Sequence, residues 1–135
     1  MADTIQLELV APERLVFSGD VEFVVVPGAE GDFGVLPGHM LFISTLRPGL
    51  IEVYENDQPK DRYVVAGGFA EVTAERVTVL STETVAVSDI DTAQARARLE
   101  QAQLDLRDAD TDEDRARYEQ AVAMAEILIE AAART

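Results

Sequence analysis

Apolar and polar residues alternate with a period of two in the N-terminal part of the chain, up to about residue 87. Near the start, Ile5, Leu7 and Leu9 would lie on one face of an extended chain, with polar residues between them on the other face. Alternation of this kind is typical of a β-strand that buries one face and exposes the other. The pattern recurs several times, so this part of the chain is predicted to consist of short strands.

Clusters of turn-forming residues separate the predicted strands. We expect a turn at 18–20, a second turn at 74–75 and a hairpin with its tip at 56–61, because these segments are rich in the residue types that tight turns favour. No helical period interrupts the strands. Short strands at this spacing predict an antiparallel β-sandwich or flattened barrel.

The period changes in the C-terminal part of the chain. Residues 88–135 contain no Gly or Pro and are rich in Ala, Leu, Glu, Gln and Arg, which are strong helix formers. Asp91 with Gln94, and Thr111 with Asp114, have the spacing of an N-cap residue and its capping-box partner. Two helices are therefore predicted, joined by a short polar turn.

Each predicted helix carries a narrow apolar seam. The seams consist of Ala95, Leu99, Ala102 and Leu106 on the first helix and Tyr118, Val122, Ala125 and Ile129 on the second. Two such seams joined by a short turn predict an antiparallel helical hairpin. The whole chain is thus expected to be of the α+β class, with a β-sandwich domain at 1–87 and a helical hairpin at 88–135.

Composition narrows the possible functions. The net charge of −15, from 26 acidic and 11 basic residues, opposes binding to nucleic acid and to anionic lipid. With no Cys and one His, a metal site would consist of carboxylates alone, and no cofactor is expected. No stretch reaches the ~18 apolar residues that span a bilayer, and the N-terminus lacks the basic region of a signal peptide. We expect a cytosolic bacterial protein that does not insert into membranes.

The most distinctive segment is 27–39, which reads PGAEGDFGVLPGH. Its regularly spaced glycines suggest a phosphate-binding loop, but the Gly-Lys-Ser/Thr ending of that loop is absent and no helical pattern follows. The glycines would instead provide positive φ angles for a series of tight turns. Glu30, Asp32 and Phe33 would then be displayed at the tip.

The same segment holds His39, the single histidine of the chain. No Ser nucleophile with an orienting acid lies near it in the sequence, so a role as catalytic base is not supported. The carboxylates fall on turns and strand faces, and they form no constellation that would indicate a hydrolase. The residues by themselves leave a protein-binding module as the alternative to an enzyme.

Five short segments, in their order and spacing, carry a resemblance to a known family. They are FSG at 17–19, PGAEGDFGVLPGH at 27–39, RPG at 47–49, GGFAEV at 67–72 and DID at 89–91. With them the chain resembles, over essentially its whole length, the epsilon subunits of bacterial F-type ATP synthases, which correspond to delta in mitochondria. The resemblance implies a β-sandwich that docks on the gamma subunit and on the ring of membrane c subunits. It implies a non-catalytic rotor subunit of the central stalk that supports the coupling of proton flow to ATP synthesis.

Location and contacts are implied in the same way. The subunit would lie peripherally at the cytoplasmic side of the bacterial inner membrane, as part of the synthase. Glu30, Asp32 and Phe33 would face the c-ring, and His39 and Ser44 would lie near gamma. His39 would then belong to a docking surface and not to an active site.

Some members of this family bind ATP through an Ile/Leu-Asp-x-x-Arg-Ala motif in the hairpin. Here Ile90, Asp91 and Ala95 match the motif, but Gln94 stands in place of the arginine. A neutral amide does not neutralise phosphate as a guanidinium does. ATP sensing is therefore not expected, and Asp91 keeps its role as a helix cap.

In this family the hairpin inhibits ATP hydrolysis when it extends into the catalytic head of alpha and beta subunits and meets an acidic segment of beta. Residues 88–135 hold 12 acidic and 6 basic residues, a net charge of −6, and like charges would oppose that contact. We expect a weak or absent inhibitory role. The alternatives are an ATP-sensing or auto-inhibitory regulator and a free-standing protein-binding module.

Overall fold

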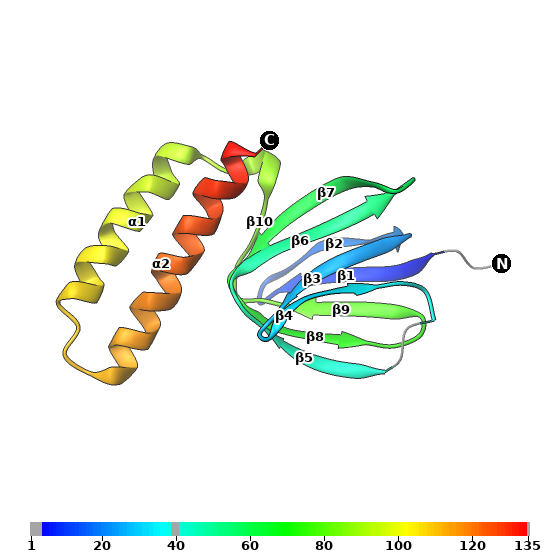
Figure 1. Cartoon of the computed structure of the whole chain (residues 1–135), viewed down its shortest axis with the longest axis horizontal. Helices are drawn as coiled ribbons and strands as arrows, with labels where there is room; N and C mark the ends of the chain where they lie inside the picture. Colours follow the sequence, from blue (N-terminus) through cyan, green and yellow to red (C-terminus); the bar gives the residue numbers. More distant parts are fainter. Residues whose placement is uncertain (1–3, 39–40, 135) are drawn as a thin grey trace. The chain divides into compact units, whose positions relative to one another are not determined.

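The computed structural model describes residues 4–38 and 41–134. The chain divides into two compact units, Met1–Ala86 and Val87–Thr135, of which the first is built of strands and the second of helices (Figure 1). The order of the elements, with all strands before the helices, confirms the predicted α+β class.

The described strands of the first unit form one sheet that curves into a nearly closed, flattened barrel (Figure 1). They pair in the order β10-β7-β6-β3-β5-β8-β9-β1-β2, and β4 pairs with β3. The strands are β1 (Ile5–Ala11), β2 (Arg14–Val21), β3 (Phe23–Gly28), β4 (Gly31–Val35), β5 (Phe42–Leu46), β6 (Gly49–Glu55), β7 (Gln58–Val65), β8 (Gly68–Val72), β9 (Arg76–Leu80) and β10 (Thr84–Ala86).

One pairing departs from the predicted antiparallel arrangement. β1 pairs with β9 in parallel, with Gln6 opposite Arg76 and Leu9 opposite Val79. Parallel neighbours need a long crossover connection, and here the chain between β1 and β9 forms strands β2 to β8 of the barrel. The alternation of apolar residues is the same in both kinds of ladder, so the sequence pattern does not reveal this direction.

The core of the first unit is formed by the inward-facing positions of the strands. Ile5, Leu7 and Leu9 are almost completely buried, as their alternation predicts. The rings of Phe17 and Tyr63 pack against this core with their centroids 5.9 Å apart. Burying one aliphatic side chain of this size contributes about 1.5–3 kcal/mol, so the aliphatic core is the main source of stability for this unit.

The turn predicted at 18–20 is wrong. Strand β2 runs through these residues, and Ser18 and Gly19 pair with Glu8 and Leu7 of β1. The hydrogen-bonded ladder with β1 outweighs the local turn preference of Ser, Gly and Asp, because strand pairing satisfies the backbone groups of the whole segment. The chain bends after β2, at Glu22.

The β6–β7 hairpin turns more tightly than the sequence suggested. Its tip consists of Asn56 and Asp57 alone, with positive φ angles of 54° and 64°, which is the geometry of a two-residue type I′ turn. Gln58 already belongs to β7. The predicted tip at 56–61 was therefore too long.

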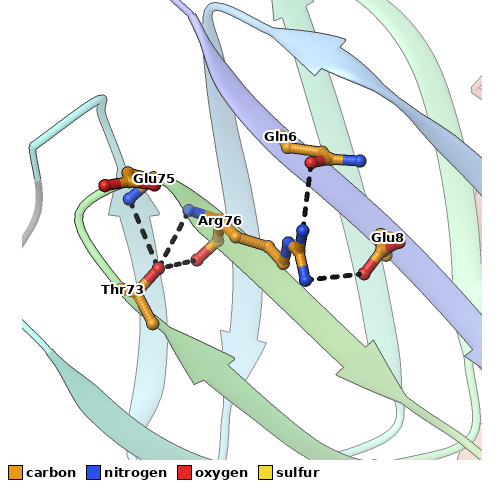
Figure 2. Close-up of polar contacts among 5 residues, drawn as sticks. All are labelled: Gln6, Glu8, Thr73, Glu75 and Arg76. Carbon is orange, nitrogen blue, oxygen red and sulfur yellow. Dashed lines mark hydrogen bonds and ion pairs between the residues drawn. The ribbon is translucent and has the colours of Figure 1, made fainter.

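The turn predicted at 74–75 is confirmed, between the end of β8 and the start of β9. The hydroxyl of Thr73 accepts hydrogen bonds from the backbone N–H groups of Glu75 and Arg76 (Figure 2). The guanidinium of Arg76 in turn donates to the side-chain oxygen of Gln6 at 3.4 Å and lies 3.8 Å from a carboxylate oxygen of Glu8. These contacts fasten the start of β9 to its parallel neighbour β1.

The second unit contains a short 3-10 helix (Val87–Asp89) and the helices α1 (Thr92–Arg107) and α2 (Asp112–Ala133). Both predicted caps are confirmed. The carboxylate of Asp91 accepts a hydrogen bond from the backbone N–H of Gln94 at 3.1 Å, and the hydroxyl of Thr111 accepts one from Asp114 at 3.0 Å. Such caps satisfy backbone donors that a helix start leaves unpaired.

The buried face of α2 is shifted from the predicted seam, of which three of the four members on this helix are only half-buried. Ala95 and Ala102 of α1 and Ala125 of α2 are buried, as expected, but Met124 and Leu128 are buried as well. Neither α1 nor α2, the long helices of the described residues, is apolar enough over its length to cross a membrane.

Candidate functional site

The segment with the repeated glycines forms the β3–β4 hairpin, whose turn consists of Ala29 and Glu30. The expected series of positive-φ turns is wrong for Gly28 and Gly34. Both lie in the β3–β4 ladder, and glycine is required at these positions because there is no room for a side chain. A Cβ on Gly28 would lie 2.7 Å from the carbonyl oxygen of Gly31, and one on Gly34 would lie 2.5 Å from the ring of Phe23. These glycines allow the two strands of the hairpin to pack closely. We call residues 28–32, which include the turn, the tip hairpin.

Backbone hydrogen bonds attach the β3–β4 hairpin to the end of β5 and to the loop that follows it. The N–H of Ala29 donates to the carbonyl of Thr45 at 2.9 Å, and the N–H of Arg47 donates to the carbonyl of Pro27 at 3.1 Å. The side chain of Arg47 adds two further bonds, to the carbonyl oxygen of Gly28 and to a carboxylate oxygen of Asp32. The tip is therefore held from one side by a neighbouring loop.

The structure separates the three residues predicted for the tip. Glu30 is exposed in the turn, and the side chain of Asp32 is 58% exposed. Phe33 is not displayed at the tip: it is partly buried against the core, with its ring in an edge-to-face contact with Phe42 at 5.1 Å. The alternation of β4 explains the difference, because Phe33 and the buried Val35 share the inward face of the strand.

Of the two residues predicted to lie near gamma, the structure describes Ser44. Ser44 lies opposite the fully buried Ala70 in the β5–β8 ladder, so it shares the inward face, and its hydroxyl donates to the carbonyl of Thr45. The outward positions of β5 are Ile43 and Thr45. His39 lies outside the described residues.

A row of exposed apolar residues, which the sequence patterns did not single out, crosses the outer face of β8, β9, β1 and β2. Phe69 lies opposite Leu80, Leu80 opposite Val10 and Val10 opposite Leu15. Residues opposite each other in a ladder project to the same side, so these side chains form one row. We call this row, together with Ile43 of neighbouring β5, the apolar band. Its exposed members are Leu15 at 55%, Ile43 at 67%, Phe69 at 44% and Leu80 at 37%.

A signal for the apolar band was present in the sequence. Each of Ile43, Phe69 and Leu80 is adjacent in sequence to an inward-facing apolar residue, which is Phe42, Ala70 and Val79 respectively. A large apolar residue on both faces of a barrel strand is costly unless the outer face is covered. Periodicity alone did not identify the band, because it does not say which strands lie side by side.

The positions of the degenerate nucleotide motif serve the start of α1. Asp91 uses its carboxylate for the helix cap, Ala95 is buried, and Gln94 is exposed. Ile90 is half-buried just before the cap. Within residues 4–38 and 41–134, no group of three or more His, Asp or Glu side chains is placed to hold a metal ion.

Comparison with known proteins gives consistent matches along the chain. The sequence model of the ATP synthase delta/epsilon chain β-sandwich domain matches residues 4–87. The ATP synthase epsilon chain of Rhodospirillum rubrum is 47% identical over 131 residues, which cover 97% of this chain and 98% of the relative. That of Maricaulis maris is 51% identical over 106 residues, 78% of this chain and 79% of the relative.

Two solved structures share the fold. A chain in the Euglena gracilis mitochondrial ATP synthase structure of OSCP, F1 and c-ring superposes with a TM-score of 0.81 at 30% identity, covering 97% of this chain and 82% of that one. A chain in the Tetrahymena thermophila mitochondrial structure of the central stalk and c-ring has a TM-score of 0.65 at 13% identity, covering 95% and 96%. The second likeness concerns the fold alone.

Proposed function

The chain belongs to the family of ATP synthase delta/epsilon chains, and we propose that it links the gamma subunit of the central stalk to the ring of membrane c subunits. It is a non-catalytic, accessory chain of the F-type synthase. The match to the Rhodospirillum rubrum epsilon chain includes the strands and the helical hairpin, so the proposal concerns the whole chain. Its partners follow from two surfaces of the first unit.

The apolar band is the observation that carries the proposal. Large side chains exposed side by side on a barrel indicate a surface that another protein covers. The band crosses neighbouring strands and includes the aromatic residue Phe69, the kind of residue on which protein interfaces depend most. We assign the apolar band to the contact with gamma. Ile43 and Thr45, and not the inward-facing Ser44, are then the residues of β5 that meet gamma.

The tip hairpin has a different character, which suits a different partner. Glu30 and Asp32 are exposed carboxylates at the turn of a hairpin that is fixed to its neighbouring loop. We assign these two residues to a polar contact with the c-ring. Phe33 would support this contact from the inward face of β4, through its packing against Phe42.

In the proposed arrangement the chain would lie at the membrane surface, on the side of the catalytic head. We propose the cytoplasmic side of the bacterial inner membrane, because the curated relatives named above are bacterial. Attachment would depend on the partner subunits.

The gamma assignment predicts the effect of a charge within the apolar band. Phe69→Glu should weaken the association with gamma by about tenfold or more, because the contact would bury an unpaired charge. The measurement is co-purification of the chain with gamma from cells that make the assembled synthase, followed by titration of the purified subunits. Leu104→Glu is the matched control, because Leu104 of α1 is exposed to 40% and lies outside the band.

Retention of gamma by Phe69→Glu would refute the assignment of the band. A native chain that never co-purifies with gamma would refute the rotor role and favour a free-standing binding module.

A further inference from the structure

We propose that Arg47 is a positioning residue that fixes the shape and the charge of the tip hairpin. The inference rests on the proposed contact between this hairpin and the c-ring, and it adds a residue from outside the hairpin to that contact. Arg47 follows β5 and lies beside the end of β3.

The guanidinium reaches both arms of the hairpin. One terminal nitrogen of Arg47 donates to the carbonyl oxygen of Gly28, at the end of β3, and the other donates to a carboxylate oxygen of Asp32, in β4. Each of these distances is 2.5 Å. Because the guanidinium is planar and rigid, binding both groups at once fixes the position of one arm relative to the other.

The glycine at position 28 makes this arrangement possible. Its backbone lies so near Gly31 and the ring of Phe33 that a Cβ would come within 3.0 Å of both. The two arms are therefore tightly apposed, and the carbonyl of Gly28 points to the side on which Arg47 lies. The hairpin and the arginine form one unit, although 15 residues separate Asp32 from Arg47 in the sequence.

The ion pair contributes little to the stability of the fold. The side chains of Arg47 and Asp32 are 42% and 58% exposed, and exposed ion pairs of this kind are largely offset by solvent. What the pair determines is the presentation of charge. The charge of Asp32 is balanced by Arg47, whereas Glu30 has no ion-pair partner among the described residues. Glu30 then carries the unbalanced negative charge at the tip.

The test compares variants in the assembled synthase in membrane vesicles. The quantity measured is the ratio of ATP-driven proton pumping to ATP hydrolysis, together with the amount of gamma that co-purifies with the chain. The variants are Arg47→Gln, Arg47→Lys, Asp32→Asn, the double variant Arg47→Gln with Asp32→Asn, and Glu30→Lys. Lys60→Gln is the control: it removes an exposed ion pair, between Lys60 and Glu55 at 2.7 Å, from the hairpin at the opposite end of β3.

If Arg47 positions the tip, Arg47→Gln lowers the pumping-to-hydrolysis ratio by about two- to tenfold, the range expected when two residues in contact are uncoupled. Gamma stays bound, and Lys60→Gln changes neither quantity. Arg47→Lys restores part of the ratio, because it keeps the charge and loses the second hydrogen bond. The double variant is no worse than the more affected single variant, because both act through the same pair.

Three results would overturn the inference. The first is a normal ratio in Arg47→Gln while Glu30→Lys lowers it, which leaves the c-ring contact in place and removes Arg47 from it. The second is a double variant whose loss equals the product of the two single losses, which means that Asp32 meets the ring independently of Arg47. The third is loss of gamma in Arg47→Gln, which makes Arg47 a general support of the barrel. If Glu30→Lys is also without effect, the proposed c-ring contact fails as well.

Discussion

At the scale of single residues, glycine is required in this chain for two physical reasons: a positive φ angle and the lack of space for a Cβ. Gly31 has a φ angle of 142° and open space around it, so glycine is required there only because of the backbone conformation. Gly68 combines a φ angle of 121° with a backbone contact, because a Cβ there would overlap the carbonyl oxygen of Leu80. Replacement at Gly68 therefore cannot be absorbed by a side-chain movement.

We predict that Gly68→Ala lowers the free energy of unfolding by about 3 kcal/mol or more, since strain in φ adds to a collision with backbone atoms. Gly31→Ala, which imposes the strain without the collision, should cost about 1 kcal/mol. Urea unfolding of the isolated chain measures both. Equal effects of the two substitutions would show that the contact with Leu80 is relieved by a backbone shift.

At the scale of secondary-structure elements, strand alternation determines which residues of a motif face a partner. In β4 the sequence Gly-Asp-Phe-Gly-Val places Asp32 outward and Phe33 inward. In β5 the same rule places Ile43 outward and Ser44 inward. If a motif is interpreted as a loop, all its residues are expected to be exposed, whereas a strand exposes every second residue on its outer face.

This placement predicts that Phe33 supports folding. Phe33→Ala should lower the free energy of unfolding by about 2 kcal/mol, less than the 3–5 kcal/mol of a fully buried Phe, because the side chain is partly buried. The matched control is Phe69→Ala, an exposed Phe of the apolar band, which should cost about 1 kcal/mol or less. Chemical unfolding of the isolated chain measures both values. A smaller loss for Phe33→Ala than for Phe69→Ala would contradict the inward placement.

At the scale of the whole molecule, charge is the property that bears on regulation. The hairpin residues 88–135 carry a net charge of −6, from 12 acidic and 6 basic residues. Three of its arginines already pair with carboxylates of α2: Arg115 with Asp112 at 2.9 Å, Arg117 with Asp114 at 3.3 Å, and Arg134 with Glu130 at 3.9 Å. Half of the basic residues of this segment are thus already close to carboxylates of the same segment.

We therefore predict that deleting residues 89–135 changes ATP hydrolysis by the assembled synthase less than about twofold. Driving a hairpin from mostly retracted to mostly extended requires about 5.5 kcal/mol of differential binding, and repulsion between like charges opposes that binding. The measurement is ATP hydrolysis by purified complexes with and without the hairpin, after confirming that both retain gamma. A several-fold rise would show that the hairpin inhibits, through specific pairs of its arginines despite the net charge.

The elements that depend on local interactions could be predicted from the sequence alone. Alternation identified the strands and the inward side chains of β1, and helix propensity with the caps Asp91 and Thr111 identified the hairpin. Five short motifs indicated the family. Each of these signals is contained in a few neighbouring residues, because side-chain periodicity, backbone preference and helix capping are local properties of the chain.

Other features depend on contacts between residues that are far apart in the chain, and they become visible only in the folded protein. The parallel pairing of β1 with β9 joins Gln6 to Arg76, and the passage of β2 through Ser18 and Gly19 follows from pairing with β1. The apolar band exists because Leu80 lies beside Val10. The tip hairpin is held by an arginine from the loop after β5. Strand order and register are set by the sum of many long-range contacts, which compete with local preferences. The outcome of this competition cannot be predicted from any one segment of the sequence.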